Sequence, residues 1–540
     1  MVGKSTAGFG NGKRTGAVTY MNYFFMTLNG AAMLLLTAAL LDAGKYYLHF
    51  LQLESYYLAG YRHSMFKKSY VFLLISLPAL LALAPVEWLS APVMLMQALA
   101  VFLAGKRLLG QSNSKKPLVV TARIKRIMAA QGLILLLAAA ALGVCFSLKR
   151  MCGLFGLIPA LLPFVVALAA LVTKPLEFAV RQYYIADAKK RLASVPGLKI
   201  IGITGSYGKT STKFLLSTIL GEKYSVLTPP SSYNTTLGVV RVIRERLQSD
   251  DQVFICEMGS RHLGDIKEIC RFVKPDIGII TSIGPQHLET FGSMENIVKG
   301  KFELIEAVKD SAFFPLGNEY TERMYEKAKS LCNAYTFGIG SKGYMHAENL
   351  TVGPDGSCFA LVNQEGESVF CTTELLGEHN VQNIVGCAAV AYKMGLTMEQ
   401  IARGISKLRP VEHRLQIVTR RPMTVIDDAF NSSPNGAKAA LKVLASFPGR
   451  RIIITPGFVE LGQSQEEYHR EFGKQIASSA DIAVLVGERT AAINQGLLEA
   501  GFDGEKIITV DSLSGATDYL AAAGRAGDTV LFENDLPDNY

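Results

Sequence analysis

The fold is decided by one stretch of the chain, Lys199-Ile-Ile-Gly-Ile-Thr-Gly-Ser-Tyr-Gly-Lys-Thr-Ser211. Its first half is an apolar, β-branched run, which predicts a buried strand. The run ends at Gly205, and good helix-forming residues follow from Lys213 to Leu220. A glycine turn between a strand and a helix N-terminus lets backbone N–H groups surround an anion. The stretch therefore predicts a phosphate-binding loop.

The residue types in this loop indicate a nucleotide and a metal ion. Lys209 is placed to reach the β- and γ-phosphates, and the Thr210 hydroxyl is placed to ligate Mg²⁺. The usual G-x4-G-K-[ST] pattern is imperfect here, because Ile203 stands where its first glycine should be. We expect ATP to contact the loop through Gly205, Ser206, Gly208, Lys209, Thr210 and Ser211.

The chain has 540 residues, which predicts more than one domain. Its mean hydropathy of +0.24 is high for a soluble enzyme, and nearly all of the apolar excess precedes residue 175. The net charge of +9 is modest, and the sequence contains no basic patch interleaved with aromatic residues. Nucleic acid is therefore not an expected partner. The eight cysteines form no CxxC pair, which indicates reduced cysteines in a cytoplasmic setting and argues against a zinc site.

A multi-pass membrane domain is expected over residues 1–174. Five apolar runs occur there, at about residues 17–41, 70–84, 91–104, 127–148 and 154–172. The second and third need their flanks to reach the ~20 residues of a span, and four spans remain an alternative to five. Lysine and arginine are concentrated in the loops between the first and second and the third and fourth runs. This bias predicts a plasma-membrane protein with a cytoplasmic ATP site.

The apolar runs carry no Asp, Glu, Lys or Arg at their centres. An intramembrane charge is the usual mark of an ion path, so a membrane anchor or lipid-access platform is expected rather than a transporter. Pro175 is expected to end the last span. The following residues, 175–198, predict an amphipathic connector helix that holds the catalytic part near the bilayer.

Two further stretches follow the phosphate loop at βαβ spacing. Residues 252–258 predict a strand that ends near Glu257, and an acid at the carboxyl end of a parallel strand can hold Mg²⁺. Residues 277–283 predict the next strand, after which His287 is placed as a metal or phosphate ligand. A helix with two lysines, Lys299 and Lys301, comes next.

These motifs together resemble the Mur ligase family, over about residues 198–528. They are Thr204-Gly-Ser-Tyr-Gly-Lys-Thr-Ser, Glu257-Met-Gly, His287-Leu-Glu-Thr-Phe-Gly-Ser with Lys301 after it, Glu378-His-Asn-Val-Gln-Asn, Arg414, Asp427-Asp-Ala-Phe-Asn-Ser-Ser-Pro and Glu460-Leu-Gly. The forms around His287 and Asp427 are most similar to the D-alanyl-D-alanine-adding branch, which makes the chain MurF-like.

The resemblance implies an ATP-dependent amide ligase, in which a carboxylate becomes an acyl phosphate and an amine displaces the phosphate. Two Mg²⁺ ions are implied, with Thr210, Glu257, His287 and Lys301 as metal ligands. Lys301 is the residue whose spacing from His287 matches the family's carbamylated lysine, with Lys299 as the alternative. Carbamylation would turn an amine into an oxygen ligand, which a hard cation prefers.

The resemblance also assigns residues farther along the chain. It implies that Asn380 and Asn383 lie near the adenine, and that Arg414 and Asp428 face ATP from the C-terminal domain. Asn431 would lie beside the reacting centre. With Lys209, His287 and Lys301, it completes the expected catalytic set.

The expected architecture is an α-helical membrane domain followed by two α/β domains. Residues 199–408 would form the phosphate-loop central domain and residues 409–540 a Rossmann-like C-terminal domain, with strands at 451–455, 482–486 and 529–532. Residues 340–375 predict a short β-rich excursion. Three departures leave the substrate open: the family's UDP-binding domain is replaced by the membrane segment, Ser433 replaces an Asn, and Glu533-Asn-Asp replaces Lys-Gly-Ser.

Three functions remain open from the sequence. The first is a membrane-anchored Mur-type ligase in peptidoglycan precursor synthesis, with an amino acid or dipeptide as amine. The second is a ligase for a lipid-linked or polymeric acceptor such as a poly-glutamate-like chain, and the third is an ATP-binding membrane regulator or translocator. Each of these three functions is compatible with membrane proteins as partners.

Overall fold

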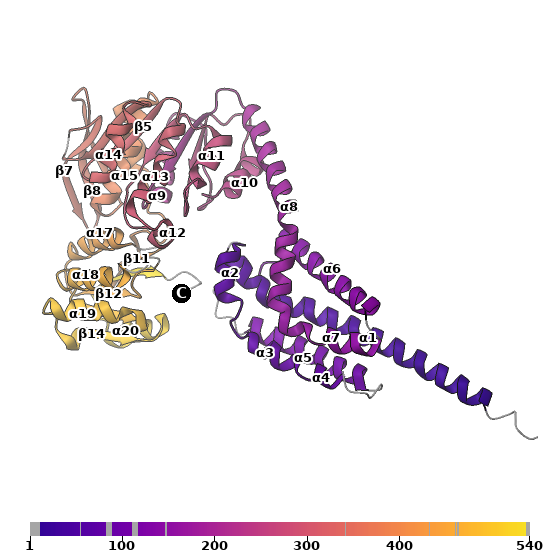
Figure 1. Ribbon diagram of the computed structural model, residues 1–540. Helices are drawn as coiled ribbons and strands as arrows, with labels where there is room; N and C mark the ends of the chain where they lie inside the picture. The colour runs from indigo at the N-terminus through magenta and orange to yellow at the C-terminus, as the bar shows by residue number, and fades with distance from the viewer. Residues whose placement is uncertain are drawn as a thin grey trace, which may run out of the picture. The chain divides into compact units, whose positions relative to one another are not determined.

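The computed structural model describes residues 11–54, 56–82, 89–110, 117–145, 148–340, 342–430, 433–459, 461 and 464–535. The chain divides into two units, with the boundary between Arg181 and Gln182. The first unit is helical, and the second contains two sheets of mainly parallel strands (Figure 1).

Apolar helices form the first unit. Four described helices are long and apolar enough to cross a membrane, judged by length and composition. These are α1 (Asn11–Leu53), α5 (Ser90–Gly110), α6 (Ala122–Cys145) and α8 (Ile158–Ala193). The shorter helices are α2 (Leu58–Ser64), α3 (Ser69–Ser76), α4 (Ala79–Ala82) and α7 (Leu148–Phe155). The second predicted run is therefore not one long helix, because Pro78 between α3 and α4 cannot donate a helical hydrogen bond.

The helices α1 and α5 pack against each other in a parallel direction. At the N-terminal end of α5, Ser90 Oγ donates a hydrogen bond of 2.9 Å to Asn29 Oδ1, which lies near the middle of α1. Further along both helices, a Cβ added at Gly105 would lie 2.6 Å from Ala43 Cα. Because α1 and α5 are parallel, the chain between them must run back to the end of the bundle where α5 begins. The helices α3 and α4 lie in this returning segment. It contacts α5 through Gln97, whose Nε2 donates to Ile75 O at 3.0 Å. The short pair thus takes the topological place of the second predicted span.

Helix α8 continues without a break through Pro163 and Pro175, as Figure 1 shows. Pro175 therefore does not end the helix, and the end of the membrane span at this residue stays a prediction. A proline removes one intrahelical hydrogen bond, and a long helix keeps the bonds on either side of it. The predicted connector is the C-terminal part of this same helix, and its Ile185 and Ala188 are buried in the second unit.

The second unit begins with a nine-stranded sheet in the order β2-β3-β1-β4-β5-β6-β7-β8-β9. Neighbours from β2 to β7 are parallel, and β7, β8 and β9 pair antiparallel. This antiparallel part confirms the predicted β-rich excursion. The strands are β1 (Lys199–Thr204), β2 (Val226–Leu227), β3 (Val253–Glu257), β4 (Ile277–Ile280), β5 (Ser311–Pro315), β6 (Asn333–Ile339), β7 (Met345–Gly353), β8 (Gly356–Asn363) and β9 (Ser368–Thr373).

Helices cover both faces of this sheet and bury two apolar cores. One face packs against α9 (Lys209–Leu220), α15 (Glu378–Lys393) and α16 (Met398–Ser406). The other packs against α10 (Thr236–Arg246), α11 (Asp265–Val273), α13 (Met294–Phe302) and α14 (Glu319–Ala328). Because both faces are covered, the carboxyl ends of the parallel strands are where a ligand is expected.

The second sheet has the order β10-β11-β15-β12-β13-β14 and is parallel except for β10. It confirms the three predicted strands of the C-terminal domain. The strands are β10 (Gln416–Thr419), β11 (Thr424–Phe430), β12 (Arg451–Thr455), β13 (Ile482–Val486), β14 (Ile507–Val510) and β15 (Thr529–Asp535). Its helices are α17 (Pro434–Ala445), α18 (Gln465–Ala477), α19 (Ala491–Glu499) and α20 (Leu513–Ala523).

Candidate active site

The phosphate loop lies between β1 and α9, as predicted, and α9 begins at Lys209 rather than later. Gly205 has φ +153° and Gly208 has φ +80°, values that favour glycine. A Cβ at Gly205 would lie 2.1 Å from Thr281 Oγ1, so no side chain fits there. Ser206 is buried within this turn, and Ser211 is buried in the first turn of α9. The glycines thus allow the close backbone curvature that a phosphate cradle requires.

Lys209 folds back into the loop that it closes. Its Nζ donates hydrogen bonds to the carbonyl oxygens of Gly205 at 2.7 Å and Ser206 at 3.1 Å. Burial lowers the pKa of Lys209 to about 8, Glu257 opposes this shift and Arg414 adds to it. An anion in the cradle would stabilise the ammonium form.

Glu257 at the end of β3 is the centre of a buried polar network. It is 1% exposed, and its Oε1 accepts hydrogen bonds of 3.0 Å from both Thr210 Oγ1 and Asn234 Nδ2. Its Oε2 has no hydrogen-bond partner among the described residues. A carboxylate beside a threonine hydroxyl fits Mg²⁺, which prefers oxygen ligands and keeps sites open for phosphate. Thr210 and Glu257 are the residues that would hold the ion.

Lys213 completes this network, and the sequence analysis did not single it out. It lies one turn after Lys209 on α9, is fully buried, and its Nζ is 3.3 Å from Glu257 Oε2. The same Nζ donates to Ser231 O at 2.8 Å. A lysine that shares a helix face with Leu216 and Leu220 was the signal that could have identified it.

The structure separates the two candidate lysines of α13. Lys301 is 1% exposed, and its Nζ donates to Ser260 Oγ at 2.9 Å. Burial lowers the pKa of Lys301 well below its usual value, and the charge of Lys209 lowers it further. Lys299 is exposed on the same helix. A buried amine of low pKa is the form that can react with carbon dioxide, so the geometry favours Lys301.

His287 caps the N-terminus of α12 (Leu288–Phe291) and has a φ of +54°. It is partly exposed, at the end of the loop that follows β4. This loop contacts the phosphate loop directly, because Ser206 Oγ donates to Gly284 O at 2.9 Å. His287 therefore follows a segment that is tied to the nucleotide site.

The two asparagines of α15 differ in their surroundings. Asn383 lies against the phosphate loop, since a Cβ at Gly208 would be 3.0 Å from its Nδ2. Asn380 is buried, and its Nδ2 donates to Leu376 O at 2.9 Å. Asn383 is thus placed for a nucleotide contact, whereas the amide of Asn380 holds the start of α15.

Arg414 and Asp428 act on the same site electrostatically. Burial lowers the pKa of Arg414, and the charges of Asp428 and Glu257 oppose this shift. Burial raises the pKa of Asp428 to about 6, although Arg414 opposes it. His379, a neighbour that the sequence analysis did not assign, has a pKa lowered to about 4 by burial and by Arg414.

Four residues that the sequence analysis singled out remain, all in the C-terminal part of the chain. Asn431 and Glu460 lie outside the described residues. Ser433 caps α17, where its side chain accepts from Gly436 N at 3.1 Å. Glu533 is fully buried and accepts a 2.8 Å hydrogen bond from Thr455 Oγ1. Burial raises the pKa of Glu533 well above its usual value.

The charges at the site share one property. Lys209, Lys301 and Arg414 all have lowered pKa values. The charge of Arg414 lowers the pKa of Lys209, and the charge of Lys209 lowers the pKa of Lys301. Buried cations that repel each other are stabilised by a bound anion. The described residues contain no group of three or more His, Cys, Asp or Glu able to hold a metal ion. Phosphate oxygens and waters would complete the ligand set of an Mg²⁺ held by Thr210 and Glu257.

Comparison with known proteins agrees with this arrangement. Residues 203–391 match the Mur ligase middle domain, and residues 413–533 match the Mur ligase glutamate ligase domain. The UDP-N-acetylmuramoyl-tripeptide–D-alanyl-D-alanine ligase of Bacillus subtilis is 28% identical over 62% of this chain and 73% of its own length. The enzyme of that name from Mycobacterium tuberculosis is 30% identical, over 62% of this chain and 68% of its length.

A solved structure shows the same fold. The crystal structure of MurF from Acinetobacter baumannii has a TM-score of 0.61 and 28% identity, over 66% of this chain and 77% of its own. The matched domains contain the phosphate loop, Glu257, Lys301 and Arg414. The chain therefore belongs to the Mur ligase family, as an ATP-dependent ligase of the MurF type.

Proposed function

We propose that this protein is a membrane-anchored Mur-type ligase that activates a carboxylate as an acyl phosphate and joins it to an amine. The observation that carries the proposal is the clustering of the phosphate loop, the Thr210–Glu257 pair and buried Lys301 in one cation-rich site. Such a site can hold the ATP phosphates next to a second anion, the substrate carboxylate.

ATP and Mg²⁺ are the proposed cofactors, with two ions as the preferred number. When bound, Mg²⁺ neutralises the charge on the phosphates. Lys209 would bind the phosphates, Asn383 would contact the nucleotide, and Arg414 would add a cation opposite Glu257. The low pKa of Lys301 supports its carbamylation, which would supply oxygen ligands near His287.

The substrates proposed first are those in the relatives' names, a UDP-N-acetylmuramoyl tripeptide and D-alanyl-D-alanine. The parts of the chain that match the family, residues 203–391 and 413–533, include the ATP site. In front of it lies the helical unit, whose apolar residues include the exposed side chains of Leu133, Leu137 and Leu168. A belt of exposed apolar residues supports insertion into a membrane.

A lipid-linked acceptor is the second candidate, and this same apolar belt favours it. An acceptor carried in the membrane would meet an enzyme anchored there without diffusing through solution. The catalytic unit is proposed to be cytoplasmic, because α8 leaves the helical unit beside Arg123 and Arg126, and clustered cations are typical of the cytoplasmic side.

The test is phosphate release by the purified full-length protein with ATP and Mg²⁺. Release that depends on both an acceptor and an amine supports a ligase, and a screen of soluble and lipid-linked muramoyl peptides identifies the acceptor. Phosphate release that no acceptor or amine stimulates would contradict the proposal. Lys209→Ala, which removes the phosphate contact, is the control for background hydrolysis.

A further inference from the structure

Lys213 is a buried cation beside the candidate metal site, and the proposed reaction gives it no role. Its side chain is fully buried, and its Nζ lies 3.3 Å from Glu257 Oε2. The same Nζ donates to Ser231 O at 2.8 Å and lies 4.4 Å from the centre of the Phe214 ring. Burial lowers the pKa of Lys213, and the neighbouring carboxylate of Glu257 opposes this shift. A carboxylate, a carbonyl oxygen and an aromatic ring are all groups that stabilise an ammonium ion.

The two oxygens of Glu257 have different neighbours. Oε1 accepts hydrogen bonds from Thr210 Oγ1 and Asn234 Nδ2, which are both neutral groups. Oε2 is the oxygen that lies next to Lys213. Ser231 and Asn234 belong to one loop, between β2 and α10, so Lys213 and Glu257 each hold this loop. The neutral groups orient the carboxylate, and Lys213 balances its charge.

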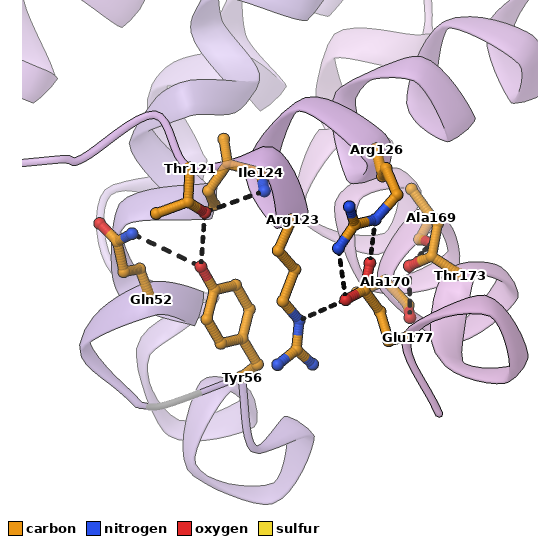
Figure 2. A network of polar contacts seen from close by, with 10 residues as sticks. All are labelled: Gln52, Tyr56, Thr121, Arg123, Ile124, Arg126, Ala169, Ala170, Thr173 and Glu177. Atoms are coloured by element: carbon orange, nitrogen blue, oxygen red, sulfur yellow. Dashed lines mark hydrogen bonds and ion pairs between the residues drawn. The ribbon is translucent and has the colours of Figure 1, made fainter. Parts of the chain in front are cut away.

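The carboxylate of Glu177 on α8 shows a different kind of ion pair (Figure 2). Arg126 donates one hydrogen bond to each of its oxygens, at 2.6 and 2.8 Å. A planar guanidinium with two parallel donors thus takes up both oxygens in a fixed geometry. Lys213 instead places a compact ammonium group beside one oxygen of Glu257. This arrangement balances the charge of Glu257 and still allows the carboxylate to ligate a metal ion.

The position of Lys213 has a consequence for metal binding. A divalent cation at Thr210 and Glu257 would meet a carboxylate whose charge is already balanced, with an ammonium group beside it. Like charges this close repel each other strongly in a buried site, where water and salt screen them little. The phosphates of ATP would supply the negative charge that outweighs this repulsion. The metal ion and the nucleotide are therefore expected to bind together.

We propose that Lys213 is a counter-ion that makes metal binding at Glu257 depend on the nucleotide. Without ATP, the charge of Lys213 keeps the affinity of the site for Mg²⁺ low. With ATP, the phosphate oxygens complete the site with Thr210 and Glu257. Lys213 is thus a positioning residue that acts through Glu257 and needs no contact with ATP. The inference rests on the proposed function only in taking ATP and Mg²⁺ as the cofactors.

The test measures Mn²⁺ binding to the full-length protein in a neutral detergent, by electron paramagnetic resonance of the free ion. Mn²⁺ is the probe because it shares the preference of Mg²⁺ for carboxylate oxygens. Without nucleotide, Lys213→Met and Lys213→Gln should bind Mn²⁺ about 10-fold or more tightly than the wild type, because a buried like charge is removed. Lys213→Gln keeps a donor for Ser231 O, so it separates the loss of charge from the loss of the hydrogen bond.

The matched control is Lys223→Met. Lys223 lies three residues after the end of α9, is exposed, and also donates to a carbonyl oxygen, that of Gly395 at 2.6 Å. Removing its charge should change Mn²⁺ affinity by less than about 2-fold, because solvent and salt screen an exposed charge. The double variant Lys213→Met with Glu257→Gln should lose the gain in affinity, because the carboxylate that binds the ion is gone.

A purely structural role for Lys213 predicts the opposite sign. A loosened loop and a misplaced carboxylate would weaken Mn²⁺ binding in both Lys213 variants, and weaker or unchanged binding without nucleotide would overturn the proposal. A gain in affinity that persists in the double variant would overturn it too, because the ion would then bind elsewhere. Thermal unfolding shows which variants are folded, and Lys213→Gln tests the site if Lys213→Met does not fold.

The wild-type protein provides a test that needs no variant. A non-hydrolysable ATP analogue should raise its Mn²⁺ affinity by about 10-fold or more, and this rise should be smaller in Lys213→Gln. Equal affinity with and without the analogue would overturn the proposal. Ligase activity is measured separately on the same proteins. Coupled binding without ligation would contradict the proposed function alone, and ligation without coupled binding would remove this inference alone.

Discussion

At the scale of single residues, the candidate active site is controlled by lysines that burial makes less basic. Lys209 and Lys301 both lose water on folding, and each is affected by another cation. A nearby anion stabilises their ammonium forms. The residues are therefore suited to respond to ATP, whose phosphates supply that anion.

The first prediction is that ATP binding takes up a proton above pH 8. The pKa of Lys209 is about 8 without ligand, so Lys209 is increasingly neutral as the pH rises from 8 to 9. Bound phosphates favour the ammonium form and raise this pKa, so binding must take up a proton, and the affinity for ATP must fall as the pH rises. Calorimetry in buffers of different ionisation enthalpy measures the uptake.

Lys209→Ala is the control for this prediction. It should abolish both ATP turnover and the proton uptake. The thermal unfolding of the protein should stay close to that of the wild type, because the described hydrogen bonds of Lys209 Nζ go to carbonyl oxygens of its own loop. A binding enthalpy that is independent of the buffer between pH 8 and 9 would contradict the assignment of Lys209.

The second prediction concerns Lys301. Lys301→Ala should abolish most ligation, and short carboxylic acids should restore part of it by supplying the missing oxygen ligands. Lys299→Ala, two positions away and exposed, is the matched control and should ligate normally. Phosphate release measures both variants. If Lys301→Ala ligates normally and Lys299→Ala does not, Lys299 rather than Lys301 is the lysine that supplies the metal ligand.

The third prediction concerns the buried pair of Lys213 and Glu257. Lys213→Met would leave the Glu257 carboxylate buried without its cation, and breaking a buried pair in this way costs about 3–5 kcal/mol. The double variant with Glu257→Gln should recover part of this loss, because it removes the unpaired charge. Denaturant unfolding of the two variants gives the comparison, and a Lys213→Met protein as stable as wild type would refute the pairing.

At the scale of elements, the sequence predicted best what depends on local chemistry. The phosphate loop needs positive φ angles at Gly205 and Gly208, which glycine adopts readily, so its turn could be predicted from the sequence alone. The apolar run of β1 is buried as expected. Prolines were harder to interpret, because their effect depends on context. Pro78 separates α3 from α4, whereas Pro175 lies inside the continuous α8. The contacts of a residue such as His287, which was assigned from its spacing to other motifs, could not be predicted. Those contacts depend on which segments the fold brings together, and the spacing of motifs along the sequence does not reveal this.

The fourth prediction tests the packing of α1 against α5. Gly105→Ala would place a Cβ 2.6 Å from the backbone of α1 at Ala43, so the two helices must separate. Gly110→Ala lies on the same helix with no atom within 4 Å of the added Cβ and should be neutral. Thermal unfolding in detergent should show a loss only for Gly105→Ala. Equal melting temperatures would mean that the helices are not in contact there.

At the scale of the whole molecule, two units with different requirements share one chain. The catalytic unit contains two complete α/β sheets with their own buried cores, as expected of a part that folds by itself. The helical unit precedes it and differs in composition, because its long helices are apolar on their exposed faces. The sequence showed this division clearly, since hydropathy changes near residue 175.

The last prediction follows from this division. A chain beginning at Gln182 keeps the whole second unit, including the phosphate loop, Glu257 and Lys301, so it should bind ATP as the full chain does. It lacks the helical unit that we propose to hold the acceptor, and positioning two reactants can contribute several kcal/mol, or about 10²-fold or more in rate. It should therefore ligate poorly with a soluble UDP-muramoyl peptide and D-alanyl-D-alanine. Phosphate release compares the two proteins, with nucleotide binding as the control for folding. Full activity of the shorter chain would show that the helices only localise an otherwise complete enzyme.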